Sequence, residues 1–196
     1  MEKETTKQKI LIEAVKLFSK EGYKAVSVEQ IAEAVGIKAP SLYKHYKSKR
    51  DIFNHILQQM ERQDTKNAAA DSMPTETKET APEAYTHIDI ADLLAFCKRQ
   101  FCYWTEDVFA SSFRKMLTVE QYRDAEMNRL YHQYLGSGPL EYIADLLGSK
   151  EKALKLYAPM HLLYSVYDCS DDKKKVFTLL DSCLKQWQEE NQGEKR

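Results

Sequence analysis

The sequence predicts an all-α protein with a small helical domain at its N-terminal end and a larger helical domain behind it. Glycine and proline are scarce, with 6 and 5 of 196 residues, which favours long helices over a loop-rich β architecture. Apolar residues recur at helical spacing along most of the chain, and no run alternates like a β-strand. The composition, 43% hydrophobic and 30% charged, is that of an ordinary globular protein.

The first two helices are marked by their end signals. Residues 7–21 have helical periodicity, and Gly22 is expected to end this helix. Ser27 and Gln30 have the spacing of a capping box, in which the hydroxyl accepts from a first-turn amide and the glutamine reaches back. Gly36 ends the second helix and permits a tight turn.

A short third helix and a longer fourth helix follow. Pro40 stands in the first turn of the third helix, where its missing N–H costs nothing, and we expect this helix to end near Lys47. Ser48 and Asp51 resemble a second capping box, with aspartate in place of glutamate. They begin a connecting helix at 48–62.

Residues 27–46 have the spacing of a helix-turn-helix. Ala32 is small where the two helices would cross, Gly36 supplies the turn, and Leu42 fills the shared core. The second helix of such a unit lies in the major groove of DNA, with its N-terminal residues facing the base edges. The surface of the third helix is polar and cationic, as phosphate contacts require; it offers Lys38, Ser41, Tyr43, Lys44, His45, Lys47 and Lys49.

The charge distribution agrees with a nucleic-acid reader joined to a different kind of domain. Residues 1–60 hold 11 Lys/Arg and 7 Asp/Glu, whereas the remainder holds 18 and 23. A basic front and an acidic rear place the DNA-binding surface in the first part of the chain.

Residues 10–57 resemble the N-terminal domain of the TetR/AcrR family of bacterial regulators. The distinctive phrases are F-x-x-x-G-Y from Phe18, S-V-x-x-I-A-x-x-x-G-I from Ser27 and L-Y-x-H-Y-K-S-K from Leu42. The resemblance implies a DNA-binding role for Ser27, Lys38, Ala39, Pro40, Ser41, Tyr43, Lys44, His45 and Lys49. It also implies a cavity in the C-terminal helices and a dimer formed by the last helix pair.

The resemblance assigns different tasks to these residues. Ser27 and Lys49 look like phosphate contacts, and residues 38–41 occupy the base-facing positions. Glu29 stands where some family members carry a base-reading arginine, and a carboxylate accepts only from cytosine, so no base contact is expected there. Tyr46 and His45 are interpreted as partly structural.

The expected domains are a helix-turn-helix domain at 1–47 and a helical regulatory and dimerisation domain at 48–196. Residues 63–87 are polar and rich in Thr, Ala and Glu, so we expect an extension of the fourth helix and then a mobile linker at about 63–87. Helices are expected from residue 88 onward, with one or two over 107–135 and a short one at 139–147.

The last two helices, expected at about 150–168 and 172–190, carry large apolar faces that must be buried somewhere. An isologous homodimer through these helices is the prediction, because paired operator half-sites demand two reading heads. The alternative is that the faces cap the core of a single chain. The faces comprise Leu154, Tyr157, Met160, His161, Tyr164 and Tyr167 on one helix, and Val176, Phe177, Leu180, Cys183, Leu184 and Trp187 on the other.

Aromatic residues crowd the middle of the C-terminal domain, and the tyrosines outnumber what a dry core needs. A ring-lined pocket would bind an apolar or aromatic small-molecule effector, whereas the alternative is plain core with surface tyrosines. The candidate pocket residues are Trp104, Phe113, Met116, Tyr131, Met160, His161 and Tyr164.

An enzyme is not expected, because the five histidines are scattered and no nucleotide-binding or nucleophile motif occurs. No cofactor and no metal are expected, and the four cysteines are interpreted as buried, reduced thiols. Without an 18-residue apolar run or an apolar leader, we expect no membrane contact and a cytoplasmic location. The prediction is a ligand-responsive repressor that binds a palindromic DNA operator as a dimer. The rivals are a constitutive architectural DNA binder, an interaction protein and a small helical enzyme.

Overall fold

The computed structural model describes residues 5–86 and 88–191, and this part of the chain is helical without a β-strand, which confirms the all-α class. It forms two compact units. Unit 1 comprises Met1–Lys66 and Asp107–Tyr131, and unit 2 comprises Asn67–Glu106 and His132–Arg196. This division differs from the expected 1–47 and 48–196, because a helix from the second half of the chain packs on the first helix. Such long-range packing leaves no local signal in the sequence.

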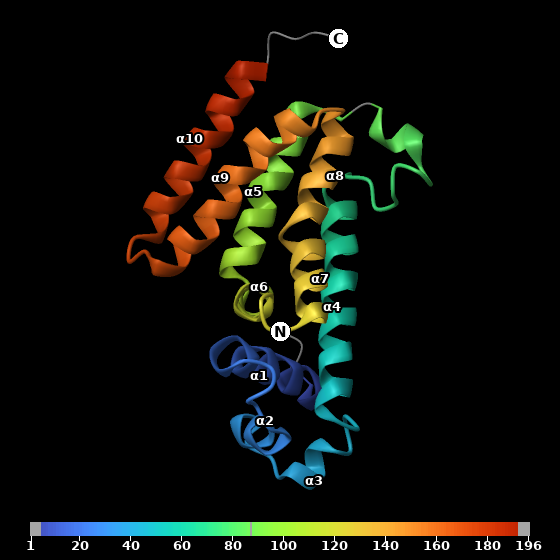
Figure 1. Ribbon diagram of the computed structural model, residues 1–196, viewed down its shortest axis with the longest axis vertical. Coiled ribbons are helices and arrows are strands. Elements are labelled where there is room, and N and C mark those ends of the chain that lie inside the picture. Colours follow the sequence, from blue (N-terminus) through green and yellow to red (C-terminus); the bar gives the residue numbers. More distant parts are fainter. Residues whose placement is uncertain (1–4, 87, 192–196) are drawn as a thin grey trace. The chain divides into compact units, whose positions relative to one another are not determined.

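Unit 1 contains the N-terminal helices and two helices from the middle of the chain (Figure 1). Helices α4 and α7 each continue from unit 1 into unit 2. The elements are α1 (Thr6–Glu21), α2 (Val28–Val35), α3 (Ala39–Leu42), α4 (Lys49–Ala70), α6 (Val108–Glu120) and α7 (Ala125–Tyr134).

The end signals of α1 and α2 act as expected. The Ser27 hydroxyl accepts from the Gln30 amide at 3.2 Å, and the Gln30 side chain accepts from the Ser27 amide at 2.7 Å. Gly22 ends α1 with φ +89°, and Gly36 ends α2 in the left-handed conformation with φ +77°. No atom lies within 4 Å of a Cβ built on Gly36, so the backbone angle rather than space demands glycine there.

The regular part of α3 is shorter than expected, since it ends at Leu42. Helix-type hydrogen bonds nevertheless continue, because the Tyr46 amide donates to the Leu42 carbonyl at 3.1 Å. The second capping box forms only in part. The Ser48 hydroxyl accepts from the Asp51 amide at 3.0 Å, but the Asp51 carboxylate accepts from the Lys47 amide at 2.8 Å instead of that of Ser48.

Large apolar side chains fill the core of unit 1. Phe18 of α1, Ile31 of α2 and Phe53 of α4 are buried, and Tyr23 joins two of them through ring contacts of 5.1 Å to Phe18 and 5.0 Å to Phe53. Phe113 of α6 is fully buried as well, in the helix that packs on α1. Residues 6–50, from α1 to the first residues of α4, are called the head below, and the head and α6 therefore share one compact body.

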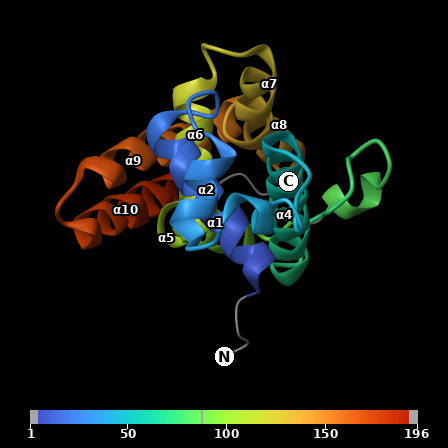
Figure 2. The same cartoon turned by 90° about the horizontal axis from the view of Figure 1, so that it is seen from below.

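Unit 2 is built around α5, α9 and α10, and Figure 2 shows α9 and α10 side by side. Phe101 of α5 stacks on Tyr164 of α9 at 5.2 Å and meets Phe177 of α10 edge-on at 5.6 Å. The elements are η1 (Pro82–Tyr85), α5 (Ile90–Glu106), α8 (Ser137–Leu147), α9 (Lys150–Cys169) and α10 (Lys173–Asn191). The expected boundaries of the last two helices are therefore confirmed to within about one residue.

Helix α4 extends to Ala70, as expected, but the segment after it, expected to be a mobile linker, is anchored within unit 2 over residues 71–86. Its two large buried side chains are Met73 and Tyr85. The Tyr142 hydroxyl of α8 donates to the Pro74 carbonyl at 2.9 Å, and its ring meets that of Tyr85 edge-on at 6.3 Å. Because the segment is mostly polar, its composition did not indicate that these few residues hold it in place. Residue 87 lies outside the described residues.

The cysteines are free thiols, but the expectation that they are buried is right only for Cys97. Cys102 and Cys183 are half-buried, and Cys169 is exposed at the end of α9. None of the helices in the described ranges combines the length and the apolar composition needed to cross a membrane.

Candidate nucleic-acid interface

Helices α2 and α3 form the expected helix-turn-helix. The two helices are in contact, Ala32 of α2 is buried, and Leu42 of α3 is 0% exposed. The turn is closed by backbone hydrogen bonds of 2.9 Å from Gly36 to the Glu33 carbonyl and from Ile37 to the Ala32 carbonyl. The spacing of small residue, glycine and apolar residue in the sequence therefore produces the geometry it predicts.

The residues around α3 expose their polar and cationic groups while Leu42 points into the core. Tyr43 is 49% exposed, and Lys38, Pro40 and Lys44 are exposed too. Ala39, Ser41 and His45 are half-buried. The surface thus brings together an ammonium group before α3, small groups in its first turn and a phenol after it, which suits a nucleic-acid backbone and base edges.

Ser27 stands at the N-terminal end of α2 as expected. Its oxygen accepts from the Gln30 amide, and this bond does not use the hydroxyl hydrogen. The hydroxyl can therefore donate to a phosphate oxygen while it continues to cap the helix. The partial positive charge of a helix N-terminus favours an anion at this position.

The structure gives Lys49 a different task from the expected phosphate contact. Its ammonium donates to the carbonyl oxygens of Tyr23 at 2.8 Å, Lys24 at 3.2 Å and Val26 at 2.7 Å. Its three N–H groups are thus directed at the loop between α1 and α2, and burial lowers its pKa. Lys49 braces this loop.

Tyr46 is structural, as interpreted from the sequence. It is buried, and its hydroxyl donates to the Lys7 carbonyl of α1 at 3.2 Å. Burial raises its pKa, with the nearby Asp51 carboxylate adding to the effect. The ring therefore joins the end of the α3 region to α1.

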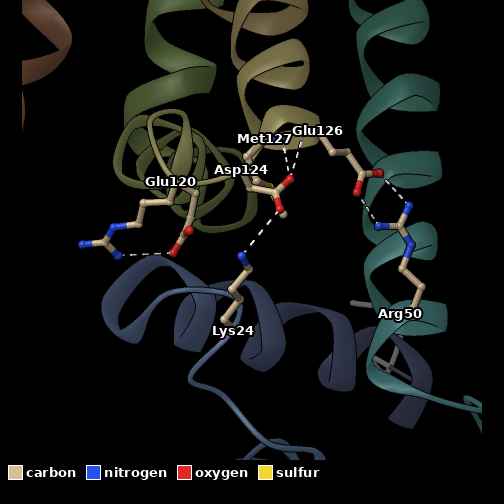
Figure 3. Close-up of polar contacts among 7 residues, drawn as sticks. Lys24, Arg50, Glu120, Asp124, Glu126 and Met127 are labelled. Carbon is tan, nitrogen blue, oxygen red and sulfur yellow. Dashed lines mark hydrogen bonds and ion pairs between the residues drawn. The ribbon is translucent and has the colours of Figure 1, made fainter.

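Two ion pairs hold the head to the start of α7, and the sequence did not reveal them (Figure 3). The two terminal nitrogens of the Arg50 guanidinium each donate a hydrogen bond to one oxygen of the Glu126 carboxylate, both at 2.6 Å. The hydrogen bond from Arg50 lowers the pKa of Glu126. Lys24 lies 3.8 Å from Asp124, which also caps α7 through the amides of Glu126 and Met127.

Gly22 is explained by a contact that no local pattern contains. A Cβ on Gly22 would come too close to a carboxylate oxygen of buried Glu120, which lies at the end of α6. The positive φ of Gly22 independently disfavours a side chain. The backbone of the turn thus requires the glycine of the F-x-x-x-G-Y phrase, and the missing side chain also leaves room for the Glu120 carboxylate.

The candidate pocket residues are divided between the units. Phe113, Met116 and Tyr131 belong to unit 1, whereas Trp104, Met160, His161 and Tyr164 belong to unit 2. Within unit 2, the His161 ring lies 6.4 Å from that of Tyr164 and the Trp104 ring 6.2 Å from that of Tyr134.

The apolar faces assigned to α9 and α10 mostly serve the chain's own core. Tyr157, Met160 and Tyr164 of α9 are buried, and so are Val176, Leu180, Leu184 and Trp187 of α10. Each helix also has exposed apolar residues: Leu154, Leu162 and Val166 on α9, and Leu179 on α10. Of the residues assigned to the two apolar faces, only Leu154 is exposed.

These features define a helix-turn-helix, and comparison with known proteins shows what this part of the chain is similar to. Residues 10–56 match the family model for bacterial regulatory proteins of the tetR family. Residues 10–56 are therefore similar to the part of these bacterial regulators that the model describes, and this similarity covers about a quarter of the chain.

Two relatives match the same part of the chain. The HTH-type transcriptional regulator AcrR of Shigella flexneri is 40% identical over 55 residues, 28% of this chain and 26% of that protein. IcaR of Staphylococcus aureus (strain Newman), a negative transcriptional regulator of the biofilm operon icaADBC, is 45% identical over 47 residues, 24% of this chain and 25% of its own length. The match thus spans about a quarter of each relative.

The fold similarity extends over nearly the whole chain. The structure of the fatty acid degradation regulator FadR from Bacillus halodurans has a TM-score of 0.64 at 15% identity, and covers 95% of this chain and 96% of that chain. At this identity the similarity concerns the fold alone.

Proposed function

We propose that the protein is a ligand-responsive transcriptional repressor that binds a palindromic DNA operator as a homodimer. The observation that carries the proposal is the exposed, cationic surface around α3, set on the fully buried Leu42. In a dimer, two such helices would enter successive major grooves about 34–36 Å apart. This function places the protein in the cytoplasm, where operator DNA lies.

Lys38, Ala39, Pro40 and Ser41 are proposed to face the bases, and Ser27, Tyr43, Lys44 and His45 to contact the backbone and groove wall. Tyr43 provides the sharpest single test, because the chain offers a matched control in Tyr122, which is 87% exposed in unit 1 outside the head. Tyr43→Ala is expected to weaken binding to all duplexes, whereas Tyr122→Ala is expected to leave it unchanged. Equal effects of the two variants would remove Tyr43 from the interface.

The homodimer is proposed to form through the exposed apolar residues of α9 and α10. Leu154, Leu162 and Val166 follow one another at multiples of four residues, so they share one face of α9, and Leu162 is 65% exposed. Family members dimerise, and isologous pairing buries such a face on both copies at once. Leu162→Glu is expected to give a monomer in sedimentation, whereas Val119→Glu, at an exposed valine of α6, is expected to remain dimeric.

The effector is proposed to be an apolar or aromatic small molecule held in unit 2. Support comes from its ring-rich core, in which Trp104, Met160, His161 and Tyr164 are the nearest candidates. A ring-lined site with few polar tips selects such ligands. Compounds of this kind are expected to raise the melting temperature of the protein and to release it from DNA.

The decisive experiment is selection of bound fragments from genomic and random DNA, followed by a compound screen for release. Enrichment of an inverted repeat would support the dimeric regulator. Binding without sequence preference, at every salt concentration, would contradict it and favour an architectural DNA binder. Specific binding that no compound releases would contradict the ligand-responsive part alone.

A further inference from the structure

The segment that DNA recognition needs is tied down at both ends to the same short stretch of chain. Lys24 stands just before the helix-turn-helix residues 27–46, and Arg50 stands just after them. Lys24 pairs with Asp124 at 3.8 Å, and Arg50 pairs with Glu126 at 2.6 Å. The two acidic partners are two residues apart at the start of α7 (Figure 3).

The contacts at the two ends are connected to each other. Lys49, next to Arg50, donates to the carbonyl oxygens of Tyr23, Lys24 and Val26. One carboxylate oxygen of Asp124 caps α7, and the other faces Lys24. The capping hydrogen bonds therefore hold the carboxylate in the position in which it pairs with Lys24. The two-pronged geometry of the Arg50–Glu126 pair fixes orientation as well as distance.

We propose that Arg50 and Glu126, supported by Lys24 and Asp124, are positioning residues that hold the helix-turn-helix in the orientation that binds DNA. We name these four residues the head clamp. The inference deepens the proposed function and rests on it. The stretch 107–131 enters from unit 2 and returns to unit 2, so the clamp attaches the head to a segment whose two ends both lead into the other unit.

Charge alone makes the opposite prediction for Glu126. Removing a carboxylate reduces repulsion of the DNA backbone, so a pure field effect would tighten binding. Loss of the clamp leaves the head free to move and weakens binding, because the head must then be ordered when DNA binds, and this ordering costs conformational entropy. The sign of the change in affinity for Glu126→Gln therefore separates positioning from a general charge effect.

The test uses the full chain and an operator obtained by selection. Glu126→Gln is expected to weaken operator binding about threefold to fivefold, the size expected for a half-exposed ion pair. Glu61→Gln is the matched control, because Glu61 is exposed on α4 and lies outside the head clamp. Affinity of the Glu126→Gln variant equal to or tighter than wild type would overturn the proposal.

A double-mutant cycle and a measurement on the free protein complete the test. Once Arg50→Gln is present, Glu126→Gln is expected to cause no further loss, whereas independent charge effects would add. In hydrogen exchange without DNA, Glu126→Gln is expected to speed exchange at residues 23–27 and 48–52, and Glu61→Gln is not. Unchanged exchange would overturn the clamp whatever the DNA result. Failure of the wild-type chain to bind any operator would contradict the proposed function instead.

Discussion

Replacing Lys49 by methionine is expected to destabilise the protein without changing the salt dependence of DNA binding. Methionine keeps a long, unbranched side chain but removes the three donors that hold the carbonyls of Tyr23, Lys24 and Val26. Hydrogen bonds to a charged group contribute about 1.5–3 kcal/mol each when well shielded. Because Lys49 is only half-buried and water can replace part of the loss, we expect a total of about 2 kcal/mol. For a chain of this size that corresponds to a melting temperature lower by roughly 4–8 °C.

The assay measures thermal unfolding and operator affinity over a range of salt concentrations. A phosphate contact in each protomer of a dimer would contribute about 2 to the slope of log affinity against log salt. Lys44→Met is the matched control, since Lys44 is exposed beside α3, and we expect it to flatten the slope while stability stays the same. If Lys49→Met flattens the slope as Lys44→Met does and leaves the melting temperature unchanged, the bracing role is refuted.

Three further changes test other contacts. Gly22→Ala is expected to lower stability by about 2–4 kcal/mol in urea unfolding, because the methyl group meets Glu120 and the positive φ is strained; a loss below 1 kcal/mol would contradict this. Alkylation at pH 8, followed by mass spectrometry, is expected to modify exposed Cys169 and spare Cys97, since burial raises the pKa of Cys97 to about 12; equal labelling would contradict it. Tyr142→Phe is expected to speed hydrogen exchange in residues 71–86, and unchanged exchange there would show that the hydroxyl is not an anchor.

The sequence predicted what depends on neighbouring residues. The Ser27 cap, the glycine turn at Gly36 and the boundaries of α9 and α10 all follow from patterns a few residues long. The surface around α3 followed from the same local logic, because one buried residue, Leu42, determines which side faces solvent.

Contacts between residues far apart in the chain could not be predicted from the sequence. Glu126 lies 76 residues from Arg50 in the chain, so nothing near either residue announces the pair. The sequence around a lysine at the start of a helix does not show whether its ammonium contacts a phosphate or backbone carbonyls. For this reason the sequence alone led to a phosphate contact for Lys49, whose ammonium donates to three carbonyls. The apolar periodicity of α9 likewise could not tell that Tyr157 faces the chain's own core while Leu162 faces outward.

We propose that the first turn of α3 reads base edges, and DNA selection carried out in parallel with the wild-type chain and with Ser41→Ala tests this. The preferred base is expected to change at one symmetric position in each half-site, with the rest of the operator retained. An identical consensus for both proteins, with undiminished specificity, would contradict it.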